Sequence, residues 1–160
     1  MRITIACVGR MKSGAERDLF DRYLDRAQKI GRALGVTAVT VRELAESPAR
    51  KPQDRKAEEA RALLALLSPG ARLVVLDENG KTLTSPQFSD RIDGWKMEGV
   101  PEIAFAIGGA DGHGQELLDR ADLKLAFGAM TWPHQIARIL LAEQVYRALT
   151  IQSGHPYHRE

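Results

Sequence analysis

The sequence predicts a single α/β domain in which a mostly parallel sheet carries helices on both of its faces. Segments of strand length alternate with segments of helical periodicity along all 160 residues. The strand segments are apolar at nearly every position, which is typical of strands that are covered on both faces. A chain of this length usually forms one domain, and no repeat or linker divides it.

The predicted strands are short runs of aliphatic and β-branched residues. They lie at residues 2–8, 36–41, 73–76, 103–107 and 123–127. The first strand ends at Gly9, and residues 78–80 (Glu-Asn-Gly) predict a turn that ends the third. A glycine-rich segment at residues 108–112 breaks the fourth strand.

The predicted helices are segments in which apolar residues recur every three to four positions. They lie at residues 14–34 and 53–67, from residue 85 onward, at 115–120, and from 133 to about 150. Ser85 followed by Pro86 predicts that the third helix starts with serine at the N-cap. Thr131 and Pro133 open the last helix, and a polar tail at residues 152–160 follows it.

Composition and charge exclude several classes of protein. Cys7 is the only cysteine, which excludes an internal disulfide and a thiolate-rich metal site. No apolar run approaches the roughly 20 residues that span a bilayer, and no signal peptide opens the chain. We therefore expect a cytoplasmic protein without a membrane partner. The net charge is +2, but residues 1–60 carry 13 basic against 9 acidic side chains. This imbalance fits either contact with phosphates or an ordinary solvated helix face.

Ligands of open α/β sheets bind at the carboxyl ends of the strands, and three of the predicted strand ends are unusual. They lie at residues 76–77, at Gly108-Gly109 and at residues 127–132. Glycine lets a backbone approach a ligand closely, so the glycine pair predicts a pocket wall, although a plain strand-to-helix turn has the same pattern. The glycine fingerprint of dinucleotide-binding folds is missing after the first strand, which argues against an NAD enzyme.

The last predicted helix is apolar around most of its circumference, as is typical of a buried helix. Ile136, Leu141 and Val145 are among its apolar residues. A terminal helix of one small domain rarely buries every face, so we expect a homodimer formed on this helix. Arg138 lies among these apolar residues, either in an interface ion pair or pointing into a site near His134.

The end of the chain concentrates polar groups of the kind that catalyse reactions. His155, Tyr157, His158 and Arg159 follow one another closely. Their spacing does not match the patterns of zinc ligands, so no metal is expected. No serine or cysteine lies in the sequence context of a hydrolase nucleophile. The competing interpretation is a frayed terminus, because chain ends are usually poorly ordered.

Taken together, these motifs resemble a known family. Residues 75–77 (Val-Leu-Asp), 107–112 (Ile-Gly-Gly-Ala-Asp-Gly), 131–134 (Thr-Trp-Pro-His) and 155–160 (His-Pro-Tyr-His-Arg-Glu) match it in order and spacing. The chain resembles the bacterial large-subunit rRNA methyltransferase H (RlmH) family of the SPOUT superfamily. The resemblance runs from end to end and includes residues 8–12 after the first strand.

The resemblance implies one SPOUT-type domain over residues 1–160, with a trefoil knot in its C-terminal half. It implies that S-adenosylmethionine binds in a bent form, without a metal, to the loops after three strands. The cofactor-binding residues would be Leu76, Gly108, Gly109, Phe127, Gly128, Ala129, Met130, Thr131 and Trp132. The implied reaction is methyl transfer to N3 of a pseudouridine in 23S rRNA, within the assembled ribosome.

That reaction requires a group that removes the N3 proton before N3 attacks the methyl group. A histidine with a pKa of about 6.5 suits this role, so we expect His158 or His155 to be the base. Arg159 or Arg138 would stabilise the negative charge on the nucleobase, and Tyr157 would stack on it. The alternative function is that of a catalytically inactive, ribosome-associated RNA-binding protein that retains the cofactor pocket.

Overall fold

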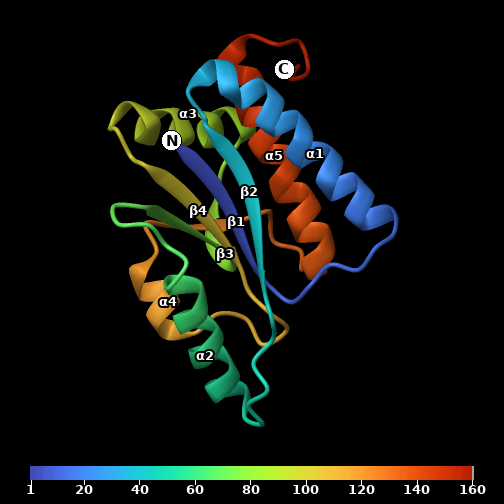
Figure 1. Cartoon of the computed structure of the whole chain (residues 1–160), viewed down its shortest axis with the longest axis vertical. Coiled ribbons are helices and arrows are strands. Elements are labelled where there is room, and N and C mark those ends of the chain that lie inside the picture. Colours follow the sequence, from blue (N-terminus) through green and yellow to red (C-terminus); the bar gives the residue numbers. More distant parts are fainter. Residues whose placement is uncertain (160) are drawn as a thin grey trace.

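The computed structural model describes residues 1–159 (Figure 1). Its sheet has five strands, which pair in parallel in the order β2-β1-β4-β3-β5. The strands are β1 (Arg2–Val8), β2 (Ala38–Leu44), β3 (Arg72–Thr82), β4 (Glu102–Ile107) and β5 (Leu123–Ala126). The predicted α/β fold with a parallel sheet is confirmed.

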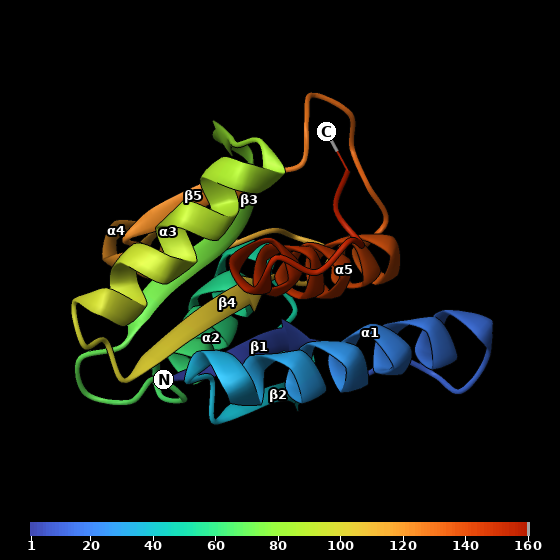
Figure 2. The ribbon, with the colours of Figure 1, turned by 90° about the horizontal axis from the view of Figure 1, so that it is seen from above.

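Helices cover both faces of the sheet, as predicted. The helices are α1 (Ala15–Gly31), α2 (Pro52–Leu64), α3 (Ser85–Met97), α4 (Gln115–Arg120) and α5 (His134–Ser153), and a short 3-10 turn (Arg32–Leu34) follows α1. α1, α3 and α5 share one apolar core with the sheet, and α2 and α4 share another on the opposite face. Figure 2 shows α5 lying between α1 and α3, and both of them contact it. Within residues 1–159, no helix combines the length and apolarity that a membrane span needs.

Alternation along β1 separates the two cores, because successive side chains of a strand point to opposite faces. Ile3, Ile5 and Cys7 face the core formed with α1, α3 and α5, whereas Ala6 and Val8 face the other. Cys7 is fully buried, and this burial raises its pKa to about 11. The thiol is therefore protonated and packs as a small apolar side chain, as its apolar surroundings in the sequence predict.

β3 continues past the turn predicted at residues 78–80, so that strand boundary was wrong. Leu76 and Lys81 both pair with Leu125 of β5, so residues 77–80 bulge out and the strand then resumes. A Cβ atom on Gly80 would lie 2.7 Å from backbone atoms of Lys124 and Leu125. The glycine that suggested a turn instead allows β5 to approach β3 closely.

The start of α3 also differs from the expectation by one residue. Thr84, not Ser85, is the N-cap: its hydroxyl accepts a hydrogen bond from the Gln87 backbone, and the Gln87 side chain accepts one from the Thr84 backbone. Ser85 is the first helical residue, and its hydroxyl donates to Gln144 Oε1 at 2.7 Å. Ser85 thus joins α3 to α5 rather than capping α3.

α5 is buried within the single chain, which removes the main argument for a subunit interface. Leu141 and Val145 have no exposed surface, because α5 packs between α1 and α3 against the sheet. The expectation that one small domain leaves much of this helix uncovered was wrong. Leu140 is different: it is partly exposed and belongs to neither apolar core.

Candidate functional site

A cavity of about 430 Å³ lies between the bulge of β3 and the carboxyl ends of β4 and β5. Its volume falls in the range of small-molecule sites, roughly 300–1,000 Å³. Three backbone segments form most of its wall: residues 76–79 of the β3 bulge, residues 107–113 after β4, and the segment from residue 125 to 132. They meet because β4 and β5 end at the same edge of the sheet, where β3 bulges between them.

The predicted cofactor-binding residues gather at this cavity. Those that line it are Leu76, Gly108, Gly109, Phe127, Gly128, Met130, Thr131 and Trp132. Ala129 is not among the lining residues and is exposed in the same loop. The structure adds Asp77, Asn79 and His113, which the sequence did not single out as binding residues.

Two glycines at the cavity are required for different physical reasons. Gly128 has a φ of 105°, a backbone conformation that side chains disfavour. Gly108 has an ordinary φ, but a Cβ there would lie 3.0 Å from Cε1 of His113 and 3.2 Å from the Gly112 carbonyl oxygen. Gly108 is therefore needed for space, and its backbone forms the cavity wall directly.

His113 connects two of the three wall segments. Its Nε2 lies 2.8 Å from the carbonyl oxygen of Leu76. Because a carbonyl oxygen only accepts, Nε2 must carry the hydrogen. Burial lowers the pKa of His113, so the ring is neutral and Nδ1 is unprotonated near neutral pH. His113 was not among the site residues predicted from the sequence; its position directly after the glycine-rich segment is the one signal that could have indicated it.

Polar contacts hold the other wall segments in place. Arg55 forms a bidentate ion pair with Asp111, with nitrogen–oxygen distances of 2.7 and 3.0 Å. This pair links the glycine-rich segment to α2. These hydrogen bonds lower the pKa of Asp111, which keeps the carboxylate ionised. In the third segment, the Trp132 indole donates to the Phe127 carbonyl at 3.2 Å.

A second cavity of about 470 Å³ adjoins the first and shares Gly109, Ala110 and His134 with it. Arg138 forms part of its wall and is buried. Its guanidinium donates to the carbonyls of Val8 and Gly9 at 2.8 and 2.9 Å, which fixes the end of β1. Arg138 thus lies beside the adjoining cavity and not in the first one, and its catalytic role stays a prediction.

The C-terminal tail is docked on α5, which argues against a frayed terminus. The Tyr157 hydroxyl donates to Glu143 Oε1 at 2.9 Å, and its ring lies 4.6 Å from the Tyr146 ring. Burial raises the pKa of Tyr157, which keeps this hydroxyl protonated. The Arg147 guanidinium lies 4.8 Å from the Tyr157 ring centre and 3.3 Å from Nδ1 of His158.

The other tail residues make fewer contacts with the rest of the chain. Nδ1 of His155 accepts a hydrogen bond from the Tyr157 backbone at 3.2 Å, and both His155 and Arg159 are exposed. Glu160, the last residue of the tail motif, lies outside the described residues.

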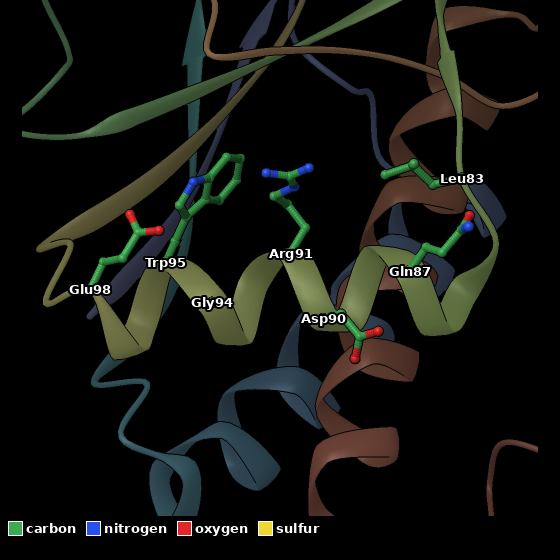
Figure 3. A pocket seen from close by; sticks show the side chains of 7 residues that line it. All are labelled: Leu83, Gln87, Asp90, Arg91, Gly94, Trp95 and Glu98. Carbon is green, nitrogen blue, oxygen red and sulfur yellow. The ribbon is translucent and has the colours of Figure 1, made fainter.

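A third concavity, of about 340 Å³, lies along α3 (Figure 3). Arg91 and Trp95 project from the same side of the helix, and the guanidinium lies 5.7 Å from the indole ring centre. Asp90 points to the other side. This groove contains none of the predicted site residues.

Comparison with known proteins identifies the family. A family model described as a predicted SPOUT methyltransferase matches residues 1–158. The chain belongs to the SPOUT methyltransferase family. It is 53% identical over 160 residues to a protein of Methylocella silvestris named ribosomal RNA large subunit methyltransferase H, with full coverage of both chains. A protein of the same name from Xanthobacter autotrophicus is 52% identical over 159 residues, with 99% of each chain covered. The predicted membership in the large-subunit rRNA methyltransferase H family is confirmed.

A solved structure shares the fold of this chain. A probable methylase family protein from Haemophilus influenzae matches with a TM-score of 0.52, over 99% of this chain and 70% of that one. The sequence identity is 14%, so this likeness bears on the fold alone.

In this SPOUT chain, the predicted catalytic residues of the tail lie away from the cavity. His134, at the start of α5, lines the cavity, whereas Arg147, which contacts His158, lies further along the same helix. At 1.5 Å per residue, about 20 Å of helix separates them. Figure 1 shows the tail at the end of α5 opposite to where the helix begins. A single chain therefore does not bring His155, Tyr157, His158 and Arg159 to the predicted cofactor-binding residues.

Proposed function

We propose that this protein transfers a methyl group from S-adenosylmethionine to N3 of a pseudouridine in 23S rRNA, acting on the assembled ribosome in the cytoplasm. The end-to-end identity of 53% to a ribosomal RNA large subunit methyltransferase H carries the proposal. The first cavity supports it, because eight of the nine predicted cofactor-binding residues line that cavity.

The residues of the first cavity fit the proposed cofactor. At Gly108-Gly109 the wall consists of backbone without side chains, which offers peptide N–H and carbonyl groups to a polar ligand. Met130 and Trp132 are 77% and 42% exposed, and they provide apolar surface for the methionine and adenine portions. S-adenosylmethionine supplies a methyl group that its sulfonium already activates, so methyl transfer requires no metal.

The chain's own residues would have to place the base and remove the N3 proton. The adjoining cavity, with Arg10 and Arg138 in its wall, is the proposed site of the nucleobase. His158 is the proposed proton acceptor, with His155 as the alternative. Nδ1 of His158 contacts the Arg147 guanidinium in the free protein. This contact must break before Nδ1 accepts a proton from the base. Arg159 would stabilise the negative charge on the base, and Tyr157 would stack on it.

A homodimer would bring the tail and the cavity together. Ile136, Leu140, Glu143 and Arg147 recur at helical spacing and so share one side of α5. This side runs from the cavity end of the helix to the residues that hold the tail. We propose that a partner related by two-fold symmetry packs on this side, with the tail of each subunit beside the cavity of the other.

Leu140→Glu should therefore produce a folded monomer. A charge at a partly exposed interface position opposes association but leaves the core intact. Leu141→Glu should instead unfold the chain, because Leu141 is fully buried within it. Sedimentation should give the intact protein twice the 17.7 kDa mass of one chain, and the Leu140 variant a single mass. Gln135→Glu, an exposed change on the same helix, is the control. A dimer that survives Leu140→Glu would place the interface elsewhere.

We also propose the trefoil knot that the family resemblance implies. The strand order supports it, because β3 lies between β4 and β5 although β4 and β5 are neighbours in sequence. The chain must therefore cross β3 between these two strands, and after β5 it returns to α5 on the opposite face from α4.

Methylation of ribosomes tests the proposed function directly. Purified ribosomes that lack the modification should accept labelled methyl from S-adenosylmethionine at one pseudouridine, mapped by nuclease digestion and mass spectrometry. Protein-free 23S rRNA should accept much less if the assembled ribosome is the substrate. Tight cofactor binding without any labelling would instead favour the inactive RNA-binding protein.

A further inference from the structure

The carbonyl group of Leu76 lies where strand pairing stops. β3 pairs with β4 only as far as Val75 and Ala106, and beyond this point β4 leads into Gly108. Leu76 still pairs with Leu125 of β5 on its other side. A carbonyl without a strand partner needs another donor, and the Nε2–H of His113 provides it at 2.8 Å.

The other side of the His113 ring packs against the glycine-rich segment. A Cβ on Gly108 would meet Cε1 and Nδ1 of the ring at 3.0 and 3.1 Å. Nδ1 is buried and has no hydrogen-bond partner among residues 1–159. With Nε2 committed to Leu76 and Nδ1 enclosed by protein, neither ring nitrogen is free to accept a proton from a substrate. The ring instead spans the gap between two walls of the cavity.

We propose that His113 is a positioning residue for S-adenosylmethionine. Its Nε2–H sets the direction of the Leu76 carbonyl, and its ring supports Gly108, so the two backbone segments face the ligand at a fixed spacing. This inference rests on the proposed function, because it assumes that the cavity binds this cofactor. A preorganised site binds more tightly, since no ordering of its walls opposes binding.

His113→Gln and His113→Met form a matched pair that isolates the hydrogen bond. The amide nitrogen of glutamine reaches about as far from Cβ as Nε2 of histidine, whereas methionine has a similar length and no donor. In calorimetry, His113→Gln should bind S-adenosylmethionine within about threefold of the unmodified protein. His113→Met should bind about tenfold more weakly, which is the order expected for one hydrogen bond.

Kinetics separates positioning from a general structural role. For His113→Met, the KM for S-adenosylmethionine should rise about tenfold, while kcat at saturating cofactor should stay within about twofold. The thermal midpoints of the two variants should agree. Equal losses of affinity in both variants would mean that ring shape matters and not the hydrogen bond, and would overturn the proposal.

A further variant keeps the proposal testable if His113→Met does not fold. His113→Asn places an amide nitrogen near the position of Nδ1, too short to reach the Leu76 carbonyl. It should bind the cofactor about tenfold more weakly than His113→Gln; equal affinities would overturn the inference. If the unmodified protein does not bind S-adenosylmethionine, the proposed function fails together with this inference. If it binds and every variant binds equally well, only the role of His113 fails.

Discussion

Removal of residues 158–160 should leave a folded protein that binds S-adenosylmethionine but transfers methyl groups at least about 100-fold more slowly. A loss of this size is typical when one acid–base group is removed. Cofactor affinity should persist because, within residues 1–159, the first cavity is lined by no residue of the tail. In this variant the rate of methyl transfer should therefore fall while the affinity for the cofactor stays unchanged.

The truncation should begin after Tyr157, because this residue contributes to the packing of the chain. Its ring contacts Tyr146 and Arg147, and its hydroxyl bonds to Glu143. Losing it would reduce stability as well as activity.

Single-turnover methylation of ribosomes measures the loss of rate. The single variants His158→Ala and Arg159→Ala show how much of this loss belongs to each side chain. Ser153→Ala, at the last residue of α5, is the control. Unchanged turnover in the truncated protein would exclude the tail from catalysis and redirect attention to His134 and Arg138.

Gly108→Val should abolish measurable binding of S-adenosylmethionine, with a loss of at least about 100-fold, while the protein stays folded. The first carbon of the new side chain already meets the His113 ring at 3.0 Å and the Gly112 carbonyl oxygen at 3.2 Å. The branched side chain must either displace His113 from Leu76 or extend into the cavity. Displacement would remove a wall that the ligand needs, and extension would fill space that the ligand occupies.

Calorimetry measures this loss, and circular dichroism checks the fold. Gly94→Val is a matched control, because Gly94 also has an ordinary φ and a Cβ there meets no atom of the described residues within 4 Å. It should bind the cofactor normally. Undiminished affinity of Gly108→Val would remove Gly108 from the binding site, whatever the result for the control.

Local patterns in the sequence determined the elements and the general location of the cavity. Alternation and helical periodicity depend on which side chains neighbours along the chain present to a core, so β1 and the two-sided helix arrangement were predictable. Glycines after β4 indicated a backbone wall, because a missing side chain has the same steric meaning in any fold. The family resemblance added the proposed cofactor, the reaction and the tail residues, none of which periodicity reveals.

Contacts between distant segments decided the rest. Gly80 belongs to a strand and not to a turn, because β5 approaches it from more than 40 positions away. Leu141 is a core residue because α1 and α3 enclose α5 within one chain, although its sequence pattern suits a subunit interface equally well. His113 reaches the Leu76 carbonyl only because β4 stops pairing with β3 at Val75. The tail lies far from the cavity because α5 is long and straight between them. Such contacts depend on long-range packing, which a local pattern of apolar and polar residues does not encode.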